Sequence, residues 1–169
     1  MPAPRVNLLV ALCFVVGAAG CSSDDEPLRS SGTPSCSAAH TRAYLREVVV
    51  STTHRATARL TFMNTGQQPC RLGVPLVVFD NGLGPDPAVD GTAVVSDGYR
   101  PDEVIRPNDG FAMPLVWGAA GACGGNHQLP IVKILITLPG ESTPLTIPAA
   151  DVKRAARDFC WIDGLTLGG

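Results

Sequence analysis

This sequence lacks any apolar run long enough to form a membrane-spanning helix, which needs about 20 residues. The run VNLLVALCFVV at 6–16 is too short, and the run IVKILITL is interrupted by Lys133 and followed by Pro139. Charge is also scarce, since 17% of the residues are charged and the formal net charge is -2. A chain without a basic surplus has little with which to neutralise phosphates, so we predict no nucleic-acid partner.

The motifs of common enzyme and nucleotide sites are missing as well. The sequence has no G-x-S-x-G elbow, no G-x-G-x-x-G or G-x-x-x-x-G-K-[ST] phosphate loop and no D-x-D-x-D-G calcium loop. We therefore predict no catalytic residues, no resident metal and no cofactor. An envelope enzyme is kept as a rival hypothesis, and it requires a polar pocket in which Ser, His or Asp side chains converge.

Glycine and proline, by contrast, are plentiful, with 18 and 15 residues, and they favour short strands and turns. The segment ATARLTFMN at 56–64 alternates apolar and polar residues, which is typical of a half-buried strand. Other short runs recur along the chain with turn residues between them, so we predict an all-β sandwich or barrel of about 7–9 short strands. The other predicted strands lie at 41–51, 70–80, 91–96, 103–107, 110–117, 129–138, 144–148 and 164–167. One short helix is predicted at 149–159. For the first half of 41–51, a turn of helix is the alternative to a strand.

The N-terminus has the three-part layout of an export signal. Arg5 precedes the apolar run, and the small residues GAAG follow it. The tetrapeptide AAGC, which ends at Cys21, resembles the lipobox of bacterial lipoproteins, in which the cysteine thiol receives a diacylglyceryl group and becomes the new N-terminal residue. We predict a signal peptide at 1–20 and lipidation of Cys21. Plain secretion, with cleavage near Ala19 or Gly20, is the alternative.

A flexible tether is predicted at 21–35. Its residues after the cysteine, SSDDEPLRSSGTP, are polar and acidic and contain little that could be buried in a core. A single β-sandwich domain, 36–169, is expected to follow the tether, since the length leaves room for one hydrophobic core. Lipidation places this domain at the extracytoplasmic face of the cell membrane, with the membrane as a partner through the anchor. Without lipid the protein is secreted.

Export also sets the redox environment of the cysteines. If Cys21 carries lipid, an even four remain in the predicted domain, namely Cys36, Cys70, Cys123 and Cys160. An even set in an exported chain predicts two disulfides, and the count alone leaves three connectivities open. The same count supports lipidation, because an unmodified Cys21 is an odd thiol.

Three histidines are the residues that keep a metal site under consideration. Imidazole suits copper and zinc, and His40, His54 and His127 lie in three separate predicted turns. Cys123 and His127 have a superficial ligand spacing, but the three histidines lie far apart in the sequence. We therefore interpret all three as surface histidines, and a small-ligand or metal-binding lipoprotein is the alternative function.

Several motifs along the chain resemble domain of unknown function 4232, a family found mainly in envelope lipoproteins of actinobacteria. The motifs are NTGQQPC at 64–70, LGVP at 72–75, VIRPNDGFAMPLVW at 104–117 and ILITLPG at 134–140, together with the isolated Cys123 and the late Cys160. The resemblance covers about 36–167. It implies an immunoglobulin-like β-sandwich and no enzymatic activity. The turn at Pro107–Gly110 and the segment 149–159 depart from the family pattern.

With this resemblance, we pair Cys36 with Cys70 and Cys123 with Cys160. Trp117 and Trp161 are then expected to be core anchors near the second disulfide, by analogy with sandwiches that pack a Trp on a disulfide. In the turn at Asn64–Gly66, we expect Asn and Gly to supply a positive φ and the Asn side chain to cap the turn.

The loop 81–102 is the predicted binding surface, because it is longer than a hairpin requires and sandwiches usually carry recognition on loops. It contains Tyr99 and Arg100, which are residue types favoured in binding hot spots. A loop without function is the alternative. In sum, the sequence predicts a monomeric, non-enzymatic, lipid-anchored envelope module with an unidentified envelope protein or glycan as its partner.

Overall fold

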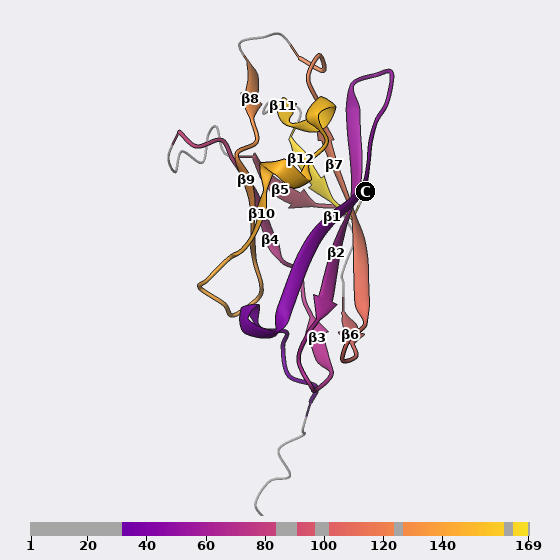
Figure 1. Cartoon of the computed structure of the whole chain (residues 1–169), viewed down its shortest axis with the longest axis vertical. Helices are drawn as coiled ribbons and strands as arrows, with labels where there is room; N and C mark the ends of the chain where they lie inside the picture. The colour runs from indigo at the N-terminus through magenta and orange to yellow at the C-terminus, as the bar shows by residue number, and fades with distance from the viewer. Residues whose placement is uncertain (1–31, 84–90, 97–101, 124–126, 161–163, 169) are drawn as a thin grey trace, which may run out of the picture. The chain divides into compact units, whose positions relative to one another are not determined.

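The computed structural model of this chain describes residues 32–83, 91–96, 102–123, 127–160 and 164–168. These residues belong to the compact unit Gly32–Gly169, and the other unit, Met1–Ser31, lies outside the described ranges. The described part is all-β, with twelve strands and three single 3-10 turns (Figure 1). Five of the strands have only three residues, which is why the strand count exceeds the about 7–9 predicted.

The elements follow one another along the chain in a fixed order. They are η1 (Ala38–His40), β1 (Thr41–Val50), β2 (Arg55–Asn64), β3 (Cys70–Leu72), β4 (Leu76–Asp80), β5 (Gly91–Val95), β6 (Glu103–Ile105), β7 (Gly110–Gly118), β8 (Gln128–Pro130), β9 (Lys133–Thr137), β10 (Leu145–Pro148), η3 (Ala149–Asp151), η4 (Arg154–Ala156), β11 (Asp158–Cys160) and β12 (Leu165–Leu167).

Strand β2 shows directly how the sequence pattern forms a strand. Ala58, Leu60 and Phe62 are buried, whereas the residues between them face outward. Leu60 lies opposite Leu45 of β1 and Met113 of β7, so apolar residues of three neighbouring strands meet on one face. Full burial of such a side chain contributes about 1.5–3 kcal/mol, which fixes the register of this part of the sheet.

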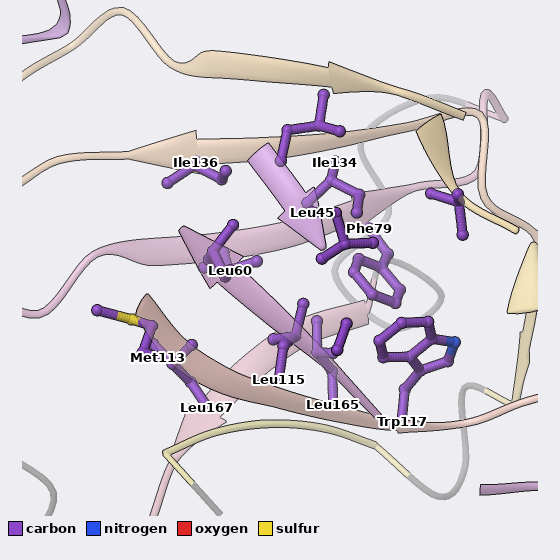
Figure 2. Packing of buried hydrophobic residues seen from close by; sticks show 14 of the residues in the cluster. Leu45, Leu60, Phe79, Met113, Leu115, Trp117, Ile134, Ile136, Leu165 and Leu167 are labelled. Carbon is purple, nitrogen blue, oxygen red and sulfur yellow. The ribbon is translucent and has the colours of Figure 1, made fainter. Parts of the chain in front are cut away.

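Eight strands form one sheet in the order β1-β2-β7-β12-β5-β4-β9-β10, with a single parallel pair, β12–β5. The sheet bends so far that its two edge strands, β1 and β10, come into contact. The core lies between its two halves, as Figure 2 shows for Leu60 and Leu115 on one side and Phe79 and Ile134 on the other. This sandwich-like arrangement confirms the predicted all-β class.

Aromatic rings fill the centre of the core. Trp117 is 1% exposed, and its ring meets that of Phe79 edge to face at 5.3 Å between centroids. Its indole N–H donates to the Ala156 carbonyl oxygen at 3.2 Å. Burial of an indole requires such a partner for its only polar atom, so Trp117 is the core anchor that the sequence predicted. Trp161 lies outside the described residues.

Two predicted strands are each divided in the structure. The segment 70–80 forms β3 and β4, which belong to different sheets, with Pro75 between them. The segment 129–138 forms β8 and β9, because its connecting residues bond to different partners: the Ile131 N–H donates to Arg157, and the Val132 N–H donates to Asp80. An apolar run thus supplies two strands when the chain changes partners within it.

The prediction of a helix at 149–159 was wrong. This segment contains the two 3-10 turns η3 and η4 and then strand β11, which pairs with β8. The Ala149 N–H donates to the Val132 carbonyl, and the guanidinium of Arg157 donates to the Val152 carbonyl. These contacts and the burial of Phe159 and Cys160 outweigh the helix propensity of the Ala, Lys and Arg residues.

The two disulfides join Cys36 to Cys70 and Cys123 to Cys160, which is the predicted pairing. Their Cα–Cα distances are 4.8 Å and 5.9 Å, within the usual range for disulfides. The first holds the segment before β1 against β3, where Ser35 also forms a bridge with Arg71. The second holds the segment after β7 against β11. In Figure 1, β3 and β11 lie at opposite ends of the described unit.

The turn at Asn64 follows the prediction in one respect and departs from it in another. The Asn64 side chain accepts a hydrogen bond from the Gly66 N–H at 2.8 Å, as the predicted cap does. Neither residue has a positive φ, so that part of the prediction was wrong. A larger residue at position 66 would be crowded, because a Cβ there would lie 3.2 Å from the Cβ of His40. The positive φ occurs instead at Asn108, in the neighbouring turn.

Candidate functional site

Three predicted functional residues lie outside the described ranges, namely Cys21, Tyr99 and Arg100. Within the predicted binding loop 81–102, the structure describes residues 81–83, strand β5 with Ser96, and Asp102. The lipidation site and the hot-spot pair therefore stay predictions.

The three histidines are brought to separate places. His40 ends η1, His54 lies in the turn between β1 and β2 with a positive φ of 58°, and His127 directly precedes β8. His54 packs on Gly121, where an added Cβ would lie 2.6 Å from the imidazole Nδ1. Within the described ranges, no three His, Cys, Asp or Glu residues are grouped closely enough to hold a metal ion.

Two aspartates at strand ends, Asp80 and Asp102, each have a local structural partner. Asp80 accepts a hydrogen bond from the Gly82 N–H at 2.7 Å and pairs with Lys133 at 3.0 Å. The Gly82 N–H, followed by Lys133, holds the pKa of the Asp80 carboxyl below its usual value of 3.8. Asp102 pairs with Arg71 at 2.7 Å. These carboxylates order turns and join strands, and they do not converge on a common site.

A hollow of about 530 Å³ lies beside the first disulfide and is lined partly by Asn64 and Gln68. The Asn64 amide donates to the carbonyls of Gln68 at 2.8 Å and Ile105 at 3.0 Å, and its oxygen accepts from Gly66. Because Asn64 is 1% exposed and its amide is engaged by its own chain, it serves to hold the turn.

A second hollow, of about 430 Å³, runs between the edge strands β1 and β10. Residues 41–44 line it from β1, residues 145–147 line it from β10, and Asp151 lines it from η3. The Thr41 hydroxyl is buried and has no hydrogen-bond partner among the described residues. A buried hydroxyl without a partner costs about 1–3 kcal/mol, so this one is a feature that stability alone does not explain.

The hydrogen-bond phase of β1 follows from its first turn. The Thr65 N–H donates to the His40 carbonyl at 2.9 Å, and this pair continues the β1–β2 register by one position. Because hydrogen-bonded and non-bonded pairs alternate in an antiparallel ladder, the even-numbered residues of 41–46 bond to β2. The odd-numbered residues direct their N–H and C=O groups away from β2, to the open edge of the sheet. These residues are Thr41, Ala43 and Leu45.

Strand β10 has a different edge. The Ala149 N–H donates to the Val132 carbonyl in register with β9, so Thr146 and Pro148 direct their backbone groups to the open side. Pro148 has no N–H, and Pro144 stands directly before the strand. Prolines on an edge strand remove donors and prevent the addition of a further strand.

The outer face of β1 carries positive charge beside the open edge. Arg42, Tyr44 and Arg46 project from this face, and the Arg46 guanidinium lies 5.6 Å from the centre of the Tyr44 ring. Arg46 also lies directly opposite Arg59 of β2. Like charges in directly opposite positions destabilise a sheet, so this pair calls for a compensating anion.

A bulge in β1 supplies that anion for only one of the two arginines. The register shifts between Arg46 and Val49, and Glu47 adopts a positive φ of 52° within the shift. The Glu47 carboxylate then lies 3.4 Å from the Nε of Arg59. Arg42 and Arg46 have no carboxylate partner among the described residues. We call Arg42, Tyr44, Arg46 and the open edge at Thr41, Ala43 and Leu45 the β1 surface.

No family model, curated protein or solved structure matches this chain. The β1 surface therefore rests on its own geometry and charge. No helix within the described ranges is long and apolar enough to cross a membrane.

The sequence contains a signal for the β1 surface that lies outside the motifs of known sites. In TRAYLREV at 41–48, Arg, Tyr and Arg recur at every second position. A strand places such residues on one face, where they form a cationic and aromatic stripe. The identity of the edge strand, however, depends on the order of the strands in the sheet.

Proposed function

We propose that this chain is a non-enzymatic, lipid-anchored cell-envelope protein that acts as a binding module and presents the β1 surface to a partner. The observation that carries the proposal is the open edge of β1, which contains no proline, beside two arginines without a carboxylate partner among the described residues. Sheet edges with free backbone groups are a common means of binding an extended chain. The dispersed histidines and aspartates of the described residues favour binding over catalysis as the role of this domain.

Membership of the domain of unknown function 4232 family is part of the proposal. Its support is the sequence resemblance together with the roles of three motif residues. Asn64 caps the turn that leads to Cys70, and Cys70 begins β3 in a disulfide. Trp117, which ends the 104–117 motif, is buried in the core. The motifs thus fall on turns, a disulfide and the core, which are features of a fold.

The lipid anchor on Cys21 is supported by the cysteine arithmetic. The four cysteines of the predicted domain are consumed by two disulfides, and such disulfides persist in oxidising compartments outside the cytoplasm. In the predicted mature chain, Cys21 is then the one thiol left for acylation. A diacylglyceryl group would hold the domain at the extracytoplasmic face of the membrane.

Intact-mass measurement of the protein extracted from membranes tests the anchor. The expected mature species begins at Cys21, carries acyl chains, and gains two hydrogens per disulfide on reduction. Cys21→Ser is expected to remain unacylated and to leave the membrane fraction. Cys13→Ser, which lies in the predicted signal, is the matched control and should still be acylated. A soluble, unacylated mature protein in the native producer would contradict the anchor.

A further inference from the structure

We infer that the β1 surface binds an extended, acidic polypeptide segment that adds to the open edge of β1 as a further strand. This partner class deepens the binding role proposed above and rests on it. The inference combines three observations on β1, namely its free backbone groups, the hollow beside it and the charge on its outer face.

The backbone groups give the direction of binding. Thr41, Ala43 and Leu45 direct N–H and C=O groups away from β2, and β1 pairs with no other described strand. An added strand would continue the ladder with main-chain hydrogen bonds, which supply affinity without depending on the partner's side chains. Such addition needs an extended partner and excludes a helical one.

The hollow between β1 and β10 provides the space. It runs along the open edge and is lined by Thr41, which is 3% exposed. The β10 side of the hollow offers little competition for the strand, because Pro148 has no donor and only Thr146 within β10 directs an N–H there.

The charges select an acidic partner. In an added strand, alternate side chains project from the same face as Arg42, Tyr44 and Arg46. Acidic side chains at those positions would lie beside two guanidinium groups that lack a carboxylate partner in the described residues. Cross-strand pairs of opposite charge stabilise a sheet by about 0.2–1 kcal/mol each.

The same charges disfavour a second copy of this chain as the occupant. Antiparallel pairing of two β1 strands centred on Tyr44 would place Arg42 of one copy opposite Arg46 of the other. Directly opposed like charges destabilise the pair. The β1 edge can therefore accept an acidic strand, whereas charge repulsion disfavours pairing with a second β1 strand. This fits a monomer.

Binding of synthetic peptides to the full protein in detergent tests the inference. The probe is a peptide of about eight residues in which glutamate alternates with valine, which is a typical strand length. The control peptides replace glutamate with lysine or carry N-methyl groups on alternate amides. We expect the glutamate peptide to bind and to slow hydrogen exchange at the Ala43 and Leu45 amides. The amides of Tyr44 and Arg46, already bonded to β2, should change little.

Charge reversal supplies the decisive variant. Arg42→Glu combined with Arg46→Glu should weaken binding of the glutamate peptide by about tenfold or more and strengthen binding of the lysine peptide. Arg106→Glu, which changes an exposed arginine on the turn after β6, is the matched control and should bind as the unaltered protein does. Circular dichroism and a thermal unfolding curve verify that each variant is folded.

Several results would overturn the inference. These are no binding of the glutamate peptide up to about 1 mM, equal binding of the N-methylated peptide, protection at β10 in place of β1, or self-association through β1. Arginine-dependent binding to phosphatidylglycerol vesicles without any peptide binding would make a lipid surface the ligand and would also overturn it. Failure here leaves acylation of Cys21 intact, whereas an unacylated protein that still binds the peptide loses the anchor alone.

Discussion

Both edge strands of the large sheet line one hollow, but they differ in the backbone groups that they direct to it. Strand β10 has Pro148 within it and Pro144 directly before it, so donors on its open side are sparse. Strand β1 has no proline, and its first half directs complete backbone groups to the same hollow. A buried hydroxyl at Thr41 adds a further unsatisfied group on the β1 side.

This difference shows that the open edge of β1 is not a general consequence of a sandwich-like fold. Proteins usually protect sheet edges against uncontrolled pairing with prolines, charges or bulges. Here β10 is protected by proline, and β1 by outward arginines and the bulge at Glu47. Arginines repel a second basic strand but attract an acidic one, so the protection of β1 is selective.

The largest expected effect on stability comes from proline at two neighbouring positions of β1, one whose N–H bonds to β2 and one whose N–H faces the hollow. Tyr44→Pro removes an N–H that bonds to β2 and should lower the free energy of unfolding by about 2–3 kcal/mol. Ala43→Pro removes an N–H that faces the hollow, so it should lower the free energy of unfolding clearly less than Tyr44→Pro does. It should also abolish peptide binding. Urea unfolding of both variants measures the difference. Equal destabilisation would show that the wrong N–H groups of β1 have been assigned to β2 and to the hollow.

A smaller effect, of opposite sign, is expected at the hydroxyl on the β1 side of the hollow. Thr41→Val keeps the side-chain volume and removes the unpartnered hydroxyl, so it should raise the free energy of unfolding by about 1 kcal/mol. Thr57→Val, on the exposed face of β2, is the control and should change stability by less than about 0.5 kcal/mol. A loss of stability in Thr41→Val would mean that the hydroxyl has a partner in solution.

The smallest effect concerns the support of β10. Asp80 and Lys133 join β4 to β9, the strand on which β10 rests. The pKa of Asp80 is lowered in the folded state, so its ionised form stabilises the fold above the unfolded pKa, and this contribution is lost as pH falls through the lower folded pKa. Asp80→Asn should therefore cost less than about 1 kcal/mol at neutral pH.

Unfolding curves measured at several pH values separate the two causes of the lowered Asp80 pKa, the Gly82 N–H and Lys133. The difference between Asp80→Asn and the unaltered protein should shrink as the pH drops below about 4. Lys133→Met should cost less than Asp80→Asn, because the Gly82 N–H, the larger cause, remains. A deficit that stays constant down to acid pH would rule out the Asp80 charge as its source.

Local patterns were enough to predict much of the fold. The alternation at 56–64 predicted β2 and its buried face, because a strand side chain must point to one side or the other. The four cysteines and the motif resemblance gave both disulfides. In each case the deciding information lies within a short stretch or in a count of one residue type.

Other features needed partners that are distant in sequence. The segment 149–159 has helical composition, but its backbone groups bond to strand β8 and to Ile131 and Val132 after it, so the segment folds as 3-10 turns and a strand. The apolar runs 70–80 and 129–138 divide where the chain changes partner strands. Propensity gives only a small bias per residue, which tertiary hydrogen bonds and burial exceed.

The candidate site divides in the same way. The sequence by itself determined the alternating arginines and tyrosine of β1, the prolines of β10 and the cysteines that become disulfides, since these depend only on residue identity and spacing. Only the tertiary structure decided that β1 and β10 are the two edges, that they share a hollow, and that Arg46 faces Arg59 while Glu47 reaches Arg59 across a bulge. Strand order decides which backbone groups stay unpaired, and it is set by packing of the whole core.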